Sequence, residues 1–178
     1  MADVMRAITL TQPWAGLVMS GIKLVENRPR PIIKNKEIVD ANASGVPIRA
    51  AIHASREIDE SVYSRVYELA PELGLPGSVR ALDCNMHMGE WYRLSRITSA
   101  ILGTIDITGA LYIGGCDQPA IMRALGRVDM LSQLRFTFGP TVYTLARPSV
   151  LKSAVPCKGK LGFWKVGQDL VDQMALAA

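Results

Sequence analysis

The segment Ser99–Ile113 constrains the fold of this chain more than any other part of its sequence. Ile101, Gly103, Ile105 and Ile107 stand at every second position, which is the two-residue period of a β-strand. Gly109 interrupts the pattern, and a glycine inside a strand marks a bulge or a sharp bend. The sequence therefore predicts a strand that bends, as strands do at the corners of a barrel.

Shorter segments of the chain carry similar signals for β-strands and helices. Strands are predicted at Arg6–Leu10, Lys23–Arg28, Arg49–Ala54 and Thr141–Ala146, with a short strand or helical turn at Leu161–Val166. Helices are predicted at Pro13–Ser20, Ser55–Leu69, Asp117–Leu125 and Gly167–Leu176. Residues 34–47 and 70–95 are predicted to be irregular, apart from a helical turn around Glu90–Leu94.

The helix predicted at Pro13–Ser20 has recognisable start and stop signals. Thr11 stands shortly before Pro13, and a hydroxyl followed by proline is typical of a helix N-terminus. Gly21 follows the helix and is suited to a left-handed C-terminal cap. The sequence therefore predicts a short helix between two strands.

The order of these elements indicates an α+β fold. Short strands without a regular βαβ repeat argue against a doubly wound sheet. A small β-barrel with flanking helices fits the pattern better. The length of 178 residues suits one domain covering residues 1–178, with an irregular insert at about 70–95.

Composition and charge restrict the class of protein. Hydrophobic residues make up 49% of the chain and charged residues 20%, which is typical of a globular domain. The net charge of +4 favours contact with phosphates, although it is also an ordinary charge for solubility. No apolar run approaches the roughly 20 residues of a membrane span, and no signal peptide opens the chain. We therefore expect a soluble, cytoplasmic protein with no membrane partner.

Cysteine usage gives no sign of a metal site. The three cysteines, Cys84, Cys116 and Cys157, are widely spaced and form no CxxC motif. Zinc ribbons need paired cysteines or histidines at short spacing. We therefore expect neither a metal nor a cofactor.

Three charged residues in the segment Lys23–Arg28 are candidates for a binding site. Alternation along a strand places Glu26 and Arg28 on one face, and the long stem of Lys23 lets it reach round to them. An arginine fork suits a phosphate or a carbonyl pair, and a carboxylate accepts hydrogen bonds from an amine or a sugar hydroxyl. The alternative is a structural salt-bridge network that ties this strand to the rest of the sheet.

The same segment carries a family resemblance. The motif Gln12-Pro-Trp-Ala15 is followed by Gly21-x-Lys-x-x-Glu-x-Arg28, and together they resemble the signature of the ASCH family, which belongs to the PUA-like superfamily. Further similar stretches are Ile52–Ser55, Leu102–Asp106 and Pro156–Trp164. The resemblance spans nearly the whole chain, apart from the insert and the last ten residues.

The resemblance implies a PUA-like β-barrel whose cleft is floored by the charged strand. It also implies binding of RNA, of single-stranded nucleic acid or of a modified nucleotide or nucleoside. The alternative is an enzyme, a ribonuclease or a nucleoside amidohydrolase, in which Lys23 and Glu26 would be catalytic. The amidohydrolases of this family carry a threonine three residues after the lysine, where this chain has Glu26.

Ligand or nucleic-acid binding is predicted for residues beyond the charged strand as well. Trp14 is equally suited to the core, His53 to a structural role, and Ser55 to capping the helix that follows. Two lysines near a glycine could meet phosphates or simply be solvated. The full set of predicted binding residues is Gln12, Trp14, Lys23, Glu26, Arg28, His53, Ser55, Lys158 and Lys160. The sequence leaves the oligomeric state open.

Overall fold

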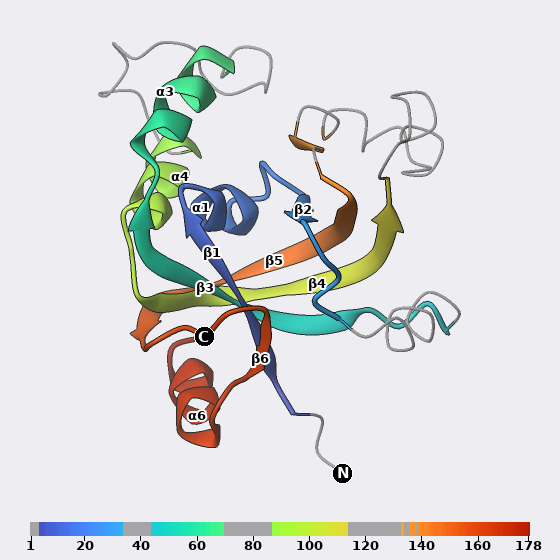
Figure 1. Cartoon of the computed structure of the whole chain (residues 1–178). Coiled ribbons are helices and arrows are strands. Elements are labelled where there is room, and N and C mark those ends of the chain that lie inside the picture. The colour runs from blue at the N-terminus through green and yellow to red at the C-terminus, as the bar shows by residue number, and fades with distance from the viewer. Residues whose placement is uncertain (1–3, 34–43, 70–86, 114–132, 134–135, 138) are drawn as a thin grey trace.

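The computed structural model describes residues 4–33, 44–69, 87–113, 133, 136–137 and 139–178, and one six-stranded mixed sheet organises them (Figure 1). The strand order is β2-β5-β4-β3-β1-β6. The strands are β1 (Arg6–Gln12), β2 (Val25–Arg28), β3 (Ile48–Ile58), β4 (Ala100–Tyr112), β5 (Thr141–Pro156) and β6 (Phe163–Lys165). The helices are α1 (Trp14–Met19), α3 (Glu60–Leu69), α4 (His87–Ser95) and α6 (Gln168–Leu176).

The long strands β3, β4 and β5 form the curved centre of the sheet (Figure 1). Strand β1 pairs with β3 in parallel, whereas the other neighbouring pairs are antiparallel. The register between β4 and β5 shifts at three places, one of them between Ile107 and Gly109. The bend predicted at Gly109 is therefore confirmed, and the repeated bulges explain how two such long strands can coil.

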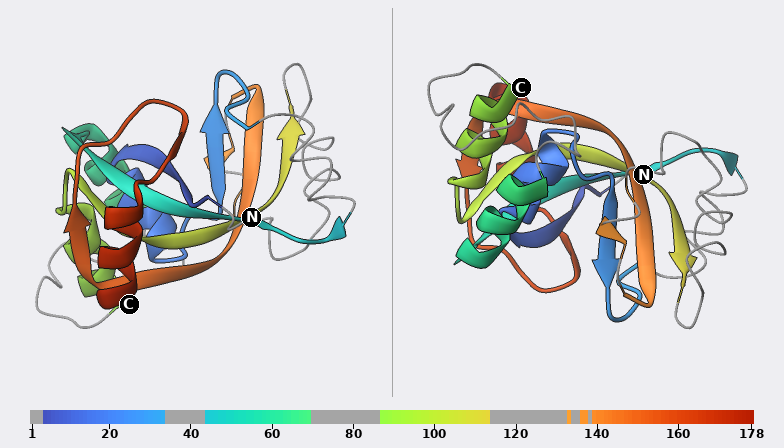
Figure 2. Two further views of the ribbon diagram at one scale, coloured as in Figure 1. Left: turned by 90° about the horizontal axis from the view of Figure 1, so that it is seen from below. Right: turned by 90° about the horizontal axis from the view of Figure 1, so that it is seen from above.

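Helices cover both faces of the sheet. Helix α1 contributes Ala15, Val18 and Met19 to the main core, together with apolar residues of β1, β3 and β4: Ile8, Leu10, Ile52, Leu102, Ile105 and Ile107. Helix α6 covers the opposite face, where Met174 packs near Trp164. Helices α3 and α4 lie beside α1 (Figures 1 and 2). Burial of these apolar faces fixes α1 and therefore the residues that flank it.

The two margins of the sheet approach each other without pairing. Strand β6 pairs with β1 only over Arg6–Ile8, and β2 pairs with β5 at the other margin. Between these margins Arg28 Nη2 donates a hydrogen bond to the carbonyl oxygen of Thr9, at 2.9 Å. The predicted α+β class with flanking helices is confirmed. The barrel description needs correction, because the described strands form an open sheet in which a side chain, not a strand ladder, spans the seam between β1 and β2.

Strand β3 is longer than predicted and displaces the start of the next helix. The helix predicted from Ser55 begins at Glu60, because β3 continues to Ile58, whose register partner on β1 is Gln12. The side chain of Asp59 marks the true helix start, since its Oδ1 accepts a hydrogen bond from the backbone N–H of Ser61, at 3.1 Å.

Helix α1 ends as predicted but begins differently. Gly21 has a φ of 76°, so the left-handed cap is confirmed. Thr11 is not the N-cap, because α1 begins at Trp14 after Pro13. The amide oxygen of Gln12 instead accepts a hydrogen bond from the N–H of Gly16, at 3.1 Å, and satisfies one of the free N–H groups of the first turn.

The insert predicted to be irregular is partly helical. Residues 87–95 form α4, so the irregular prediction is wrong there, although the expected turn around Glu90–Leu94 lies within this helix. Residues 70–86 and the helix predicted at 117–125 lie outside the described residues, as does most of the 34–47 segment. None of the described helices has the length and apolar character that crossing a membrane requires.

Candidate functional site

The three charged residues predicted from the sequence form one connected chain of contacts. Lys23 Nζ donates hydrogen bonds to the carbonyl oxygen of Val25 and to Glu26 Oε2, the latter at 3.0 Å. The other carboxylate oxygen, Glu26 Oε1, lies 3.0 Å from Arg28 Nε. Both oxygens of Glu26 therefore have a cation beside them, and the carboxylate holds the two cations at fixed positions.

This trio lies on the wall of an open pocket of about 570 Å³. The pocket occupies the seam between the two sheet margins, where β1 faces β2. Its wall is made by Thr9–Thr11 of β1, Trp14 of α1, the trio with Asn27, Ser55–Glu57 at the end of β3, and Leu161–Gly162 before β6. The unclosed seam of the sheet is therefore the place where side chains from distant parts of the chain meet.

Lys23 forms a rigid part of the pocket floor. Its side chain is 2% exposed, and its ammonium lies 5.5 Å from the centre of the Trp14 ring. Two of its hydrogen bonds go to Val25 and Glu26, so the remaining direction faces the aromatic ring. Strand β2 begins only at Val25, which explains how Lys23 reaches the same side as Glu26. The ammonium group of Lys23 is therefore fixed in place, and it lies beneath the surface that a ligand would touch.

Arg28 is held on two sides and open on a third. Its Nε faces Glu26 and its Nη2 donates to Thr9, whereas its Nη1 has no acceptor among the described residues. The side chain is 19% exposed and lines the pocket. A planar guanidinium held in this way loses little conformational entropy when it binds an oxygen acceptor. Arg28 is therefore the best-prepared donor of the site.

The rim of the pocket adds residues that the sequence did not single out. Arg56 and Glu57 are exposed at the end of β3, and Arg56 has no ion-pair partner in the described part of the chain. Leu161 is 98% exposed, which is unusual for a leucine and offers apolar surface at the mouth. The polar residues Ser55–Glu57 follow the predicted strand directly. In the sequence this pattern is typical of a strand end beside a cleft, but it is equally typical of a helix start.

Ser55 lines the pocket and does not cap a helix. Its hydroxyl instead accepts a hydrogen bond from the backbone N–H of Glu57, at 3.1 Å, within the strand end. Trp14 also lines the pocket and is only partly buried. The structure therefore brings together five of the nine predicted binding residues: Trp14, Lys23, Glu26, Arg28 and Ser55.

Gln12 and His53 lie outside the pocket lining. Gln12 is fully buried, and its amide nitrogen donates to the carbonyl oxygens of Leu94 at 2.8 Å and Ile97 at 2.5 Å. His53 is 2% exposed, and its Nε2 lies 3.1 Å from the carbonyl oxygen of Cys157. Burial lowers the pKa of His53 below its ordinary value, and the hydrogen bond to Cys157 opposes that shift only partly. Both side chains have structural contacts that account for their positions.

Lys158 and Lys160 are exposed on the loop between β5 and β6 and do not line the pocket. The loop itself is fixed against β1, because Thr9 Oγ1 donates to the carbonyl oxygen of Lys160, at 2.8 Å. The backbone of Lys160 therefore lies beside β1, and the next residue along the chain, Leu161, lines the pocket. Within the described residues, no three His, Cys, Asp or Glu side chains lie close enough together to hold a metal ion.

Comparisons with known proteins give a fold-level similarity. No protein-family model matches the sequence, and no curated protein does. Two similar solved structures are the ASCH protein from Zymomonas mobilis and a single-residue variant of an ASCH protein from the same organism. The first is 10% identical with a TM-score of 0.49, covering 97% of this chain and 94% of its own. The variant is 12% identical with a TM-score of 0.49, and the match covers 98% of this chain and 96% of the variant's chain.

At such low identity the function of the chain must be inferred from its own side chains.

Proposed function

We propose that the protein binds single-stranded RNA and holds one nucleotide of it in the pocket between β1 and β2. The observation that carries this proposal is the convergence of Lys23, Glu26 and Arg28 on the wall of one open pocket. The pocket volume of about 570 Å³ lies within the usual range for small-molecule sites. A nucleotide is a ligand of suitable size, with oxygen acceptors for the cations.

The pocket offers a partner for each part of a nucleotide. Arg28 Nη1 is free to donate to a phosphate oxygen or a base carbonyl, and Arg56 supplies a second cation at the rim. Trp14 and Leu161 give apolar surface against which a base can pack. Three cations and two carboxylates line the pocket, so its net charge suits an anionic ligand.

Two arguments favour RNA over DNA. The motif resemblance to the ASCH family implies RNA. Thr11 and Ser55 also line the pocket, and a threonine or serine hydroxyl can pair with a ribose 2′-hydroxyl. A deoxyribose oligomer of the same sequence should therefore bind more weakly than its ribose counterpart.

A titration with nucleoside monophosphates and with a short single-stranded RNA tests the proposal. Replacing Arg28 with glutamine should weaken both affinities by about ten-fold or more, because a charge-assisted hydrogen bond is removed. Arg30→Gln is the matched control: Arg30 is exposed two residues later and does not line the pocket. Equal effects of the two substitutions, or no binding by the unmodified protein, would contradict the proposal.

The same proposal covers two kinds of ligand, an unmodified nucleotide and a modified one, because either would bind in the same pocket. Thermal denaturation with a panel of nucleosides separates the two ligands, since a ligand that binds only the folded state raises the melting temperature. A modified nucleoside that stabilises the protein more than any unmodified nucleotide would identify a sensor of that modification.

The contacts of Lys23 favour binding over the enzymatic alternative. A lysine nucleophile needs an uncharged amine with a free approach to its substrate. Here the ammonium donates to Val25 and Glu26 and is 1% exposed as a whole residue. Incubation with RNA and modified nucleosides should give no product; turnover that Lys23→Ala abolishes in a folded protein would establish the enzyme instead.

A further inference from the structure

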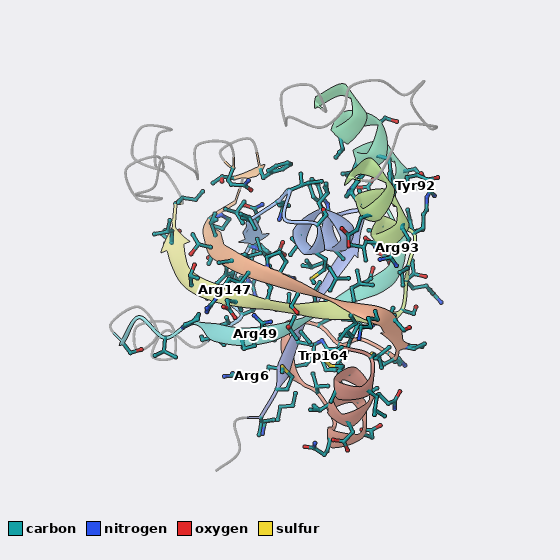
Figure 3. All side chains as sticks on the ribbon, turned by 180° about the vertical axis from the view of Figure 1, so that it is seen from behind. Arg6, Arg49, Tyr92, Arg93, Arg147 and Trp164 are labelled. Atoms are coloured by element: carbon teal, nitrogen blue, oxygen red, sulfur yellow. The ribbon has the colours of Figure 1, made fainter. Side chains whose placement is uncertain are left out.

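A second group of charged residues lies on the sheet face that α6 covers, away from the pocket. Asp106 of β4 is buried, and Arg49 Nη1 donates to its Oδ1 at 2.8 Å. Arg147 of β5 binds the other oxygen, Oδ2, through both Nε and Nη2. Figure 3 shows Arg49 and Arg147 close together on this side of the molecule. Neither these arginines nor Asp106 line the pocket.

The charges of this group do not balance. Two guanidinium groups share one carboxylate, and both carboxylate oxygens are already occupied. No other described acid pairs with either arginine. Asp106 has 4% of its side chain exposed, whereas Arg49 has 41% and Arg147 has 72%. The negative charge is therefore buried and the excess positive charge faces solvent.

The arginines keep unused hydrogen-bond donors. Arg49 Nη1 also donates to the carbonyl oxygen of Arg147, at 3.3 Å, which links the two residues directly. Arg49 Nε and Nη2 and Arg147 Nη1 have no acceptor among the described residues. Two oriented guanidiniums with several free N–H groups match the oxygens of a phosphate better than they match a single carboxylate.

The backbone holds Arg147 in an unusual conformation. Its φ is 52°, a left-handed value that non-glycine residues rarely adopt, and Pro148 follows it. The strand bulges here, since Asp106 pairs with Ala146 while Thr104 pairs with Ser149. The bulge directs an exposed arginine to Asp106 although it fills no core space. Local strain of this kind is a signal of a functional position when it comes with independent chemistry.

We propose that Arg49 and Arg147, oriented by Asp106, bind a backbone phosphate of a nucleic acid. The proposal depends on the proposed function only in naming nucleic acid as the polymer. Strand β3 connects the two places, because Arg49 stands near its start and Ser55–Glu57 at its end, roughly 20 Å away. A strand of several nucleotides is long enough to contact both, whereas a single nucleotide reaches only one.

The test compares a nucleoside monophosphate with a single-stranded RNA oligomer on the full chain. Arg49→Gln and Arg147→Gln should each weaken oligomer binding by about ten-fold and leave monophosphate binding unchanged. The slope of log K against log salt should fall by about 0.7 for each phosphate that the variant no longer neutralises. Lys152→Gln is the matched control, because it removes the same charge from an exposed position on β5. Oligomer affinity equal to that of the control would overturn the proposal.

The variant Asp106→Asn distinguishes binding by two oriented arginines from simple attraction by positive surface charge. The substitution raises the net positive charge, so simple attraction predicts tighter oligomer binding, whereas disordering of the guanidiniums predicts weaker binding. Weaker binding by a variant that still melts cooperatively supports the proposal, and tighter binding overturns it. Monophosphate binding that Arg28→Gln leaves unchanged, with oligomer binding still sensitive to Arg147→Gln, would contradict the pocket and not this site.

Discussion

At the scale of single residues, Gln12 shows how much one buried amide can hold together. Its side chain joins the end of β1 to the first turn of α1, to the end of α4 and to the chain just after α4, through contacts with Gly16, Leu94 and Ile97. Replacing it with alanine removes all three of these hydrogen bonds to the backbone. We expect Gln12→Ala to lower the free energy of unfolding by about 3 kcal/mol, measured by urea denaturation.

A surface glutamine provides the control for that substitution. Gln168 is exposed, and its side chain donates only to Asp172, at 2.8 Å. Gln168→Ala should therefore change the free energy of unfolding by less than about 0.5 kcal/mol. If the two substitutions have similar effects, the buried hydrogen bonds of Gln12 contribute little.

The sequence could not have assigned this role to Gln12. Its partners Leu94 and Ile97 are 82 and 85 positions away, so only the folded chain brings them to the amide. The motif around Trp14 was informative about the neighbourhood, since Trp14 does line the pocket. It could not show which of two nearby side chains points into the cleft and which into the core.

His53 should make the stability of the protein depend on pH. Burial lowers the pKa of its imidazole below 6.5, so the folded state resists protonation more than the unfolded state does. The unfolded chain then binds more protons between the two pKa values, and stability rises with pH in that window. We expect the free energy of unfolding to fall as the pH is lowered from about 7.5 to about 5.5.

The variant His53→Gln isolates this contribution from that of the carboxylates. It cannot take up a proton, so the difference in unfolding free energy between the two proteins should shrink as the pH falls. Parallel pH profiles for the two proteins would show that the imidazole titrates alike in the folded and unfolded states.

At the scale of elements, periodic segments were predictable and junctions between elements were not. The alternation of isoleucines identified β4, and Gly109 identified one of its bulges. The stretch Ser55–Ile58 has no clear period, and its pairing with β1 decides that it is strand. Because pairing depends on a distant partner, local sequence favoured a helix start there.

The loop between β5 and β6 should be sensitive to a single added methyl group. A Cβ on Gly159 would overlap ring atoms of His53 and would lie 2.9 Å from Thr9 Oγ1. The ring is buried and cannot move aside, so the loop must shift. We expect Gly159→Ala to cost about 1–3 kcal/mol in urea denaturation and to weaken nucleotide binding, because Leu161 and Gly162 of this loop line the pocket.

Lys158→Ala is the neighbouring control, since this side chain is exposed. It should leave the free energy of unfolding almost unchanged. If Gly159→Ala is as mild as Lys158→Ala, the loop is not packed against His53 in solution.

At the scale of the whole molecule, the open seam between β1 and β2 is what creates the site. The charged residues of the Lys23–Arg28 segment were recognisable from their spacing. The sequence could not show that the sheet stays open beside them, because closure depends on how far the bulged strands coil. Arg28 is the link between the margins, through its hydrogen bond to Thr9 at 2.9 Å.

A nucleotide bound in this seam should join the two margins of the sheet. It would contact β1 and β2 together, so it should slow amide hydrogen exchange in both strands and leave the centre of β4 and β5 nearly unchanged. At a nucleotide concentration of about 100 times Kd, the protein should gain about 2.7 kcal/mol of stability. Hydrogen exchange followed by mass spectrometry, with and without nucleotide, measures the pattern. Protection confined to β5, or spread evenly over all strands, would place the ligand elsewhere than between β1 and β2.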